Sequence, residues 1–257
     1  MMDIKDFSEL QEVLKGLNDD FFWRPLEADD CEKVSFYIEK IEETKTWINR
    51  NQEKGAILED FVVMLFERFQ GATVKKNIRI ADNETDVEVE FSDVAVNEFM
   101  KRYMMPKIIC ECKNKARSSV DVGMVAKLAE LIPLRESNLG IFFSINGIGG
   151  YGWRFGEGKR KKIFNKLRIP ILSFRVEELR KLLDGKNLLT MIREKMNNLI
   201  DEVDDDSPDV PETSHTEYSR RMKQIIFHLE QCSLLSNEEA LSIRTKINDR
   251  YGNIELE

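Results

Sequence analysis

The chain has 257 residues, of which 42% are hydrophobic, so it is long enough to bury one sizeable core but too short for two large domains. No segment approaches the roughly 18 consecutive apolar residues of a membrane-spanning helix, and the N-terminus lacks the basic-then-apolar layout of a secretion signal. We therefore expect a soluble, cytoplasmic protein with no membrane partner. The four cysteines show no paired spacing, which argues against a disulfide framework.

The formal net charge of −8 argues at first against a nucleic-acid partner, because binding to a polyanion depends on Lys and Arg side chains. The charge is unevenly distributed along the chain, however. Residues 1–52 and 201–257 carry net charges of −6 and −8, whereas residues 53–200 carry +6. The charge of the central part of the chain is therefore compatible with binding to DNA.

The N-terminal residues 1–52 are predicted to form a helical extension, with helices at about 7–17 and 30–51, because apolar residues recur there at helical spacing. Residues 53–200 combine helices and strands in the order α-β-β-β-α-β-β-α, which predicts an α/β domain. The expected elements of this domain are a helix at 54–70 capped by Gly71, strands at 73–80, 85–91 and 107–113 with a polar insertion at 93–103, a helix at 120–135, strands at 139–145 and 169–174, and a helix at 176–183.

The C-terminal part of the chain has a different character. Residues 201–217 are acidic, contain two prolines and lack periodic apolar residues, so they are predicted to form a linker. Residues 218–257 are predicted to form a helical hairpin, with amphipathic helices at about 218–232 and 237–251. Because a hairpin of this size rarely has a core of its own, it should dock on the main domain, on another copy or on a partner.

Three charged side chains stand out within two of the predicted strands. In the segment 107–113 the residues alternate, so Glu111 and Lys113 point to one face while Cys110 and Cys112 point to the other. The segment 85–91 alternates in the same way and places Asp86 on its polar face. If the two strands pair, the two carboxylates converge on a site that suits Mg²⁺ or Mn²⁺, and the neighbouring ammonium is placed to act on a water or a phosphate.

The order of these residues resembles the PD-(D/E)XK nuclease superfamily, and most closely its Mrr-like restriction endonuclease group. The resemblance covers roughly residues 53–185 and includes Glu59 in the helix before the sheet. It implies a restriction-endonuclease-like fold, in which helices flank a mixed β-sheet core, with the helical N-terminal extension and the C-terminal hairpin added to it. Thr85 stands at the proline of the signature, which this family often lacks. Lys127 lies in the helix where many members have a glutamine, and this departure leaves the auxiliary role of that position unassigned.

The resemblance also implies roles for single residues. Asp86 and Glu111 would bind the divalent ion, Mg²⁺ or Mn²⁺, together with the backbone carbonyl of Cys112. Lys113 would orient the attacking water and stabilise charge on the phosphate. Glu59 would bind a second metal ion or a metal-bound water. The reaction implied is metal-dependent hydrolysis of a DNA phosphodiester bond.

Other interpretations of these residues stand beside the nuclease interpretation. Glu111 and Lys113 form a weak surface ion pair if their strand lies at the edge of the sheet, and Asp86 is a turn residue if its strand starts later. On the preceding helix, Asp60 is an alternative to Glu59. The neighbouring acids of the Asp86 strand, Glu88 and Glu90, are interpreted as solvated residues or minor contributors.

The segment 146–162 is predicted to be a flexible, glycine-rich basic loop. Its aromatic and cationic residues suit contact with DNA, and the candidate DNA-binding residues are Arg154, Lys159, Arg160, Lys161 and Lys162. A solvated basic loop is the plainer alternative. The glycines at 147–152 also match a dinucleotide-binding pattern, but we expect no apolar helix after them to receive a phosphate.

Together these patterns predict a Mg²⁺-dependent DNA endonuclease, plausibly in restriction or other antiviral defence, where the biological role follows from the resemblance alone. Because cutting both strands needs two sites, we expect a homodimer, or a partner subunit recruited through the N-terminal helices or the C-terminal hairpin. One alternative is a non-catalytic subunit with a nuclease fold that binds DNA or assembles a defence complex. Another is an effector that senses nucleotides.

Overall fold

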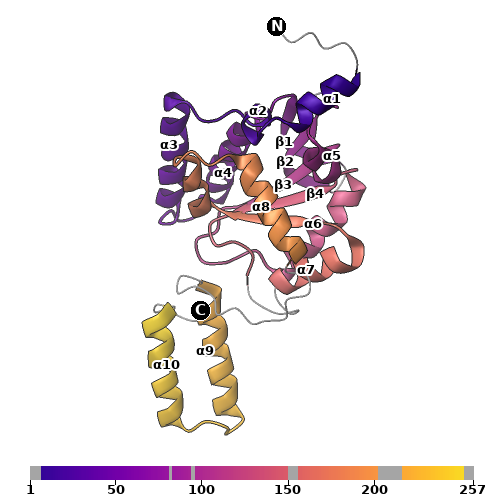
Figure 1. Ribbon diagram of the computed structural model, residues 1–257. Helices are drawn as coiled ribbons and strands as arrows, with labels where there is room; N and C mark the ends of the chain where they lie inside the picture. Colours follow the sequence, from indigo (N-terminus) through magenta and orange to yellow (C-terminus); the bar gives the residue numbers. More distant parts are fainter. Residues whose placement is uncertain (1–6, 81–82, 94–95, 150–155, 202–215, 252–257) are drawn as a thin grey trace.

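The structure is a computed structural model, and it describes residues 7–80, 83–93, 96–149, 156–201 and 216–251. Its fold is mixed α/β, with helices on both faces of one sheet (Figure 1). In chain order the elements are α1 (Phe7–Lys15), α2 (Asp19–Phe22), α3 (Ala28–Thr44), α4 (Asn51–Phe66), β1 (Ala72–Ile80), β2 (Asn83–Phe91), α5 (Glu98–Tyr103), β3 (Lys107–Lys113), α6 (Val122–Leu134), β4 (Leu139–Ser144), α7 (Gly156–Leu167), β5 (Ile171–Arg175), the 3-10 helix η1 (Val176–Leu182), α8 (Leu188–Asp201), α9 (Thr216–Gln231) and α10 (Asn237–Tyr251).

The five strands of the sheet lie side by side in chain order, β1-β2-β3-β4-β5. The pairs β1/β2 and β2/β3 are antiparallel, whereas β3/β4 and β4/β5 are parallel. This arrangement makes β3 an inner strand, with an antiparallel neighbour on one side and a parallel neighbour on the other. The alternative in which Glu111 and Lys113 lie on an edge strand is therefore wrong.

The inner strands are apolar along most of their length because helices cover both of their faces. All residues of β4 are buried, and so are the five central residues of β3. Gly140 in β4 permits a close approach of α6, since a Cβ atom there would lie 2.7 Å from Cδ1 of Ile132. The sheet thus has two core layers, one on each face.

One layer of the core includes the N-terminal helices. Val34, Ile38 and Ile41 of α3 are fully buried in the same cluster as Phe61 of α4 and Val87 of β2. The second layer, on the opposite face, is formed mainly by α6 with Ile109 of β3, Phe142 of β4 and Ile171 of β5. Part of the predicted N-terminal extension, residues 17–41, therefore contributes to the main core.

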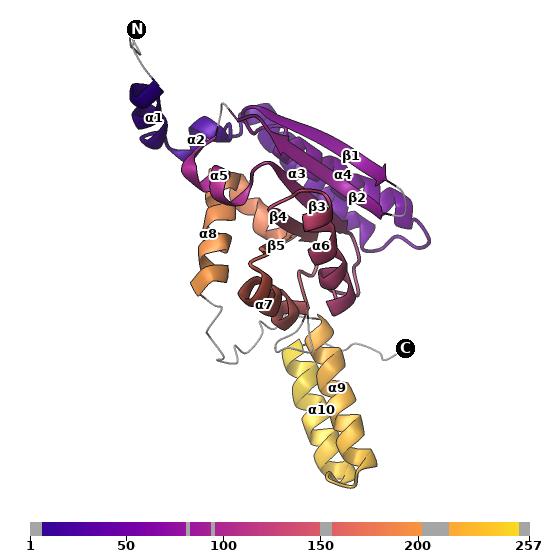
Figure 2. The same cartoon turned by 90° about the vertical axis from the view of Figure 1, so that its right-hand side faces the viewer.

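The two C-terminal helices form a hairpin, as predicted. The helices α9 and α10 lie beside each other and apart from the helices that cover the sheet, as both views show (Figures 1 and 2). Their own apolar cluster consists of Ile226, Ala240 and Ile247, with partly buried neighbours around it. Residues 202–215, most of the predicted acidic linker, lie outside the described part of the chain.

Several segments differ from the sequence-based expectation. The first half of α7 lies in the predicted glycine-rich loop, where consecutive cations hide the helical pattern and only Ile163 and Phe164 are large buried side chains. The predicted polar insertion contains α5, which buries Phe99 and Met100. Residues 188–201, to which no element was assigned, form α8. Gly71 has a positive φ of 69° but follows the end of α4 by several residues, so it is a turn residue before β1 and not a helix cap.

Other features agree with the sequence. The described cysteines are all free, and Cys110 and Cys112 are buried. Within the ranges that the structure describes, no helix is both long enough and apolar enough to cross a membrane.

The aromatic packing around Phe143 leads to a prediction about stability. Its ring is fully buried, stacks on Phe174 with a centroid distance of 5.5 Å and meets the edge of Phe66 at 6.0 Å. Phe143→Ala should lower the free energy of unfolding by about 3–5 kcal/mol, measured by urea denaturation. The matched control is Phe36→Ala. Because Phe36 is 61% exposed, this substitution should lower the free energy of unfolding by no more than about 0.5 kcal/mol. Equal losses in the two variants would contradict this assignment of the core.

Candidate functional site

Asp86, Glu111 and Lys113 meet on one face of the sheet. The ammonium nitrogen of Lys113 lies 2.9 Å from Oε2 of Glu111 and 3.3 Å from Oδ2 of Asp86. The antiparallel register pairs Val87 with Cys110, so the alternation of both strands brings Asp86 next to Glu111. The predicted convergence of the two carboxylates is therefore present.

The backbone of β3 fixes the position of Asp86. The N–H group of Cys112 donates a hydrogen bond of 2.7 Å to Oδ2 of Asp86, the same oxygen that accepts from Lys113. Asp86 lies within β2, so it is not the turn residue of the alternative interpretation. A carboxylate held by a backbone donor is oriented before any ligand binds.

Burial and charge act against each other at this site. Burial raises the pKa of Glu111 above the ordinary glutamate value, whereas the ammonium of Lys113 acts to lower it and the charge of Asp86 adds to the rise. For Lys113, burial by itself lowers the pKa, but the attraction of Glu111 and Asp86 outweighs this effect, so the pKa of Lys113 is raised. Lys113 is therefore a permanent cation at neutral pH.

A second cation from α6 also acts on Glu111. The exposed side chain of Lys127 lies close enough for its charge to contribute to lowering the pKa of Glu111, as the smallest of the influences on that carboxyl. Its helix packs against β3 on the face that carries the site. Lys127 thus belongs to the surroundings of the site. The sequence placed it in the right helix but gave it no role.

The oxygen atoms of the two carboxylates are suitable ligands for a divalent ion. The oxygen Oε1 of Glu111 is buried and has no hydrogen-bond partner, which leaves a costly polar atom that a hard cation would satisfy. Asp86 supplies a second oxygen ligand on the same face. Within the described ranges, however, no group of three or more Asp, Glu, His or Cys side chains is close enough to bind one metal ion.

Glu59 contacts a different cation from the one that pairs with Asp86 and Glu111. It forms an ion pair of 3.3 Å with Lys76 of β1, and the same ammonium lies 2.6 Å from Oδ1 of Asp60. Its charge nevertheless contributes to the raised pKa of the Cys112 thiol, an effect that comes first from burial of the thiol. Glu59 is therefore near the end of β3, but among the described residues its ion pair is with Lys76 and not with the site.

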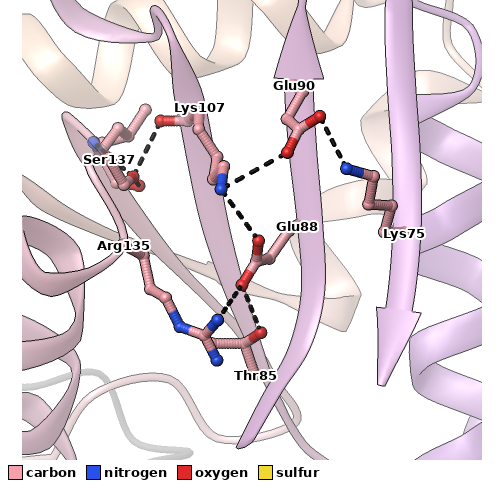
Figure 3. A network of polar contacts seen from close by, with 8 residues as sticks. Lys75, Thr85, Glu88, Glu90, Lys107, Arg135 and Ser137 are labelled. Atoms are coloured by element: carbon pink, nitrogen blue, oxygen red, sulfur yellow. Dashed lines mark hydrogen bonds and ion pairs between the residues drawn. The ribbon is translucent and has the colours of Figure 1, made fainter. Parts of the chain in front are cut away.

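The acids that follow Asp86 in β2 belong to a separate network (Figure 3). Glu88 is only 3% exposed in its side chain, lies 3.2 Å from Lys107 and 3.8 Å from Arg135, and accepts a hydrogen bond from Thr85. Glu90 lies further along the strand and pairs with Lys107. The expectation that Glu88 is solvated is wrong, because α6 ends at this point and covers the strand with Arg135.

The predicted DNA-binding cations lie on a helix and not on a loop. Lys159, Arg160, Lys161 and Lys162 belong to the first turns of α7. Arg160 is held by Glu157 at 2.7 Å and donates to the carbonyl of Ile171, so it is largely a structural residue. Lys162 is exposed. Arg154, with residues 150–155, lies outside the described residues.

A cavity of ≈ 870 Å³ opens next to Lys113, and sequence reasoning missed it. Most of its lining residues come from the connection between α3 and α4 and from the connection between β3 and α6. They are Lys45, Thr46, Trp47, Ile48, Asn51, Lys54, Gly55, Cys112, Lys113, Asn114, Lys115, Ala116, Arg117 and Ser118. The available signal was the run Lys113–Arg117, in which cations continue past the end of the strand. We call this cavity the cationic cleft.

No protein-family model matches the chain, and no curated protein or solved structure matches it. A function for this chain must therefore be argued from its own residues and their geometry.

The opposing influences on Glu111 lead to a prediction. Lys113→Met should raise the pKa of Glu111 further, because it removes the strongest influence that keeps this pKa down. The measurement is a pH titration of the side-chain carboxyl carbon by NMR. Lys127→Met is the control and should produce a smaller rise, since it removes the weaker cation. A pKa that stays constant in Lys113→Met would show that the ion pair does not govern the site.

Proposed function

We propose that this protein is a Mg²⁺-dependent endonuclease that hydrolyses phosphodiester bonds in DNA, with a core of the PD-(D/E)XK type. The observation that carries this proposal is the ammonium of Lys113 within 3.3 Å of two carboxylates, one of which has a buried oxygen without a partner. Paired acids beside a lysine are suited to bind a divalent ion and a phosphate together.

The surrounding fold supports a restriction-endonuclease-like assignment. A helix precedes three antiparallel strands, and after a crossover helix a fourth strand joins the third in parallel, in the order α4-β1-β2-β3-α6-β4 interrupted only by the short α5. This is the order that the resemblance to the Mrr-like group implies. The site residues lie on the second and third strands, as that resemblance requires.

The chain's own residues have distinct roles in the proposed reaction. Lys113 stays protonated, so it donates hydrogen bonds to the attacking water and to a phosphate oxygen but takes no proton. The N–H of Cys112 holds Asp86 in place. Asp86, Glu111 and the carbonyl of Cys112 would hold Mg²⁺ or Mn²⁺, which when bound supplies Lewis-acid stabilisation of the phosphate charge. Glu59 would serve a second ion, after release from Lys76.

The proposed biological setting is restriction or another form of antiviral defence, and it rests on the family analogy. Cleavage of both strands requires two copies of the site, so we propose a homodimer or a partner subunit. The hairpin of α9 and α10 is one candidate contact, because Phe227 and Leu241 are more than half exposed on it. The N-terminal helices are the other.

A non-catalytic role is the second candidate, and one observation favours it. Lys113 pairs with both carboxylates at once, and within the described ranges no third acidic, His or Cys side chain completes a metal-binding group. A chain with this arrangement could bind DNA or assemble a defence complex without cutting. The two candidates differ in whether the wild-type protein cleaves DNA in the presence of a divalent ion.

Cleavage of supercoiled plasmid in Mg²⁺, Mn²⁺ or EDTA tests the proposal. The wild-type protein should nick the plasmid only with a divalent ion, and Lys113→Ala and Asp86→Asn should each lower the rate by at least about 100-fold. The matched control is Glu90→Gln, which removes a carboxylate of the same strand outside the site and should leave the rate unchanged. Wild-type activity in both site variants would exclude this site. Absence of cleavage by the wild type in every metal would favour the non-catalytic role.

The cations of α7 are proposed to contact duplex DNA outside the site. Replacing Lys159, Lys161 and Lys162 with Ala should reduce the slope of log K against log salt for a duplex by up to about 2.7, because each phosphate contact contributes about 0.9. The control replaces three exposed lysines elsewhere, Lys33, Lys101 and Lys181, and should leave the slope unchanged. An unchanged slope in the α7 variant would remove this helix from the DNA-binding surface.

A further inference from the structure

The lining of the cationic cleft is rich in Lys and Arg, although Asp86 and Glu111 offset the charge of Lys113. Five of its described lining residues are Lys or Arg, and none is Asp or Glu. Lys45 is paired with Glu42 at 2.5 Å, but Lys115 is exposed and forms no ion pair with any residue that the structure describes. A concave surface lined by cations concentrates a polyanion. The cleft is therefore suited to hold phosphates next to Lys113.

Hydrogen bonds fix both walls of the cleft. Asn114 donates to the carbonyl of Lys54 at 2.8 Å and contacts the hydroxyl of Thr44, so it joins the end of β3 to α3 and α4. The side-chain amide of Asn146 donates to the carbonyls of Lys115 and Ala116 in the opposite wall. The cations are thus mounted on ordered backbone, which reduces the entropy cost of binding.

An aromatic ring is held at the cleft in the same way. Trp47 is half-buried, and the guanidinium of Arg50 lies 3.7 Å from the centre of its ring. Arg50 is itself held by two hydrogen bonds to Glu53, and Lys54 donates to the carbonyl of Trp47 at 2.6 Å. The ring is therefore oriented before a ligand arrives. A positively charged groove with a fixed aromatic ring is the arrangement that binds unpaired bases.

The size of the cleft indicates the form of the nucleic acid. Its ≈ 870 Å³ lies within the range of about 300–1,000 Å³ that encloses compact ligands, which is room for a few nucleotides of one strand. We propose that the cleft binds an unpaired, single-stranded segment of the substrate, with phosphates on Lys115 and Arg117 and a base stacked on Trp47. This inference rests on the proposed function and adds the strand form of its substrate.

Binding in EDTA tests the cleft separately from cleavage. A fluorescein-labelled single strand of roughly 12 nucleotides and the matching duplex are titrated with the full chain, and fluorescence anisotropy is recorded. The single strand should bind more tightly than the duplex. Trp47→Ala should weaken single-strand binding by about 5- to 150-fold, and Trp47→Phe should retain most of the affinity because it keeps an aromatic face. Circular dichroism melting checks that each variant is folded.

Two double variants of equal charge locate the phosphates. Replacing Lys115 and Arg117 with Ala should reduce the salt slope for the single strand by about 1.4, whereas replacing Lys33 and Lys181, two exposed lysines elsewhere, should leave it unchanged. Tighter binding of the duplex, full affinity in Trp47→Ala, or an equal loss of slope in the Lys33 and Lys181 variant would each overturn the inference. Cleft-dependent single-strand binding without any cleavage would preserve it and count against the nuclease reaction alone. Cleavage that persists in all cleft variants, with no preference for the single strand, would overturn the inference and leave the proposed nuclease reaction intact.

Discussion

The interaction on which the candidate site depends is the pairing of one lysine with two carboxylates across the β2/β3 boundary. Burial of Glu111 is costly for its charged form, and Lys113 offsets that cost while its own burial is offset by the two acids. With both acids ionised the three groups sum to one negative charge. Such a group is stable without a ligand yet still attracts a cation, because one oxygen of Glu111 remains without a partner.

The sheet topology explains why this group and the cationic cleft are neighbours. The strand β3 pairs antiparallel with β2 and parallel with β4. Its C-terminal end carries Glu111 and Lys113 and continues into the connection to α6. That connection is one wall of the cleft. At the other end of α6, Arg135 reaches the buried Glu88 and fixes the helix against β2 (Figure 3). The helix is anchored at the end remote from the cleft, and the site itself is formed by β2 and β3.

The sequence predicted the parts of the molecule that follow a simple period. Alternation in 85–91 and 107–113 was sufficient to predict that Asp86 and Glu111 meet, because residues that alternate with a period of two can point to only two faces of a sheet. The prediction from sequence failed for a charged residue that is buried. Glu88 continues the same alternation as Asp86 but is buried, since Lys107 and Arg135 come from distant segments to neutralise it. The cationic turns of α7 looked like a loop for the related reason that long lysine side chains obscure a short apolar stripe. Neither the contacts of Glu59 nor the cleft could be predicted, because both depend on how connections fold over the sheet.

The net charge of −8 does not argue against a polyanionic substrate once the charges are placed in space. Screening at physiological salt limits the reach of an exposed charge to about 8 Å, so a phosphate in the cleft responds to Lys113, Lys115 and Arg117 and hardly to acids on distant elements. The helices α9 and α10 lie apart from the sheet in both views (Figures 1 and 2), and their five acidic and six basic side chains nearly cancel. What matters for binding is therefore the local field of the cleft, to which Lys54, Lys115 and Arg117 contribute, while Asp86 and Glu111 offset the charge of Lys113. The cleft and the helix α7 are therefore two separate groups of cations on a chain whose net charge is negative.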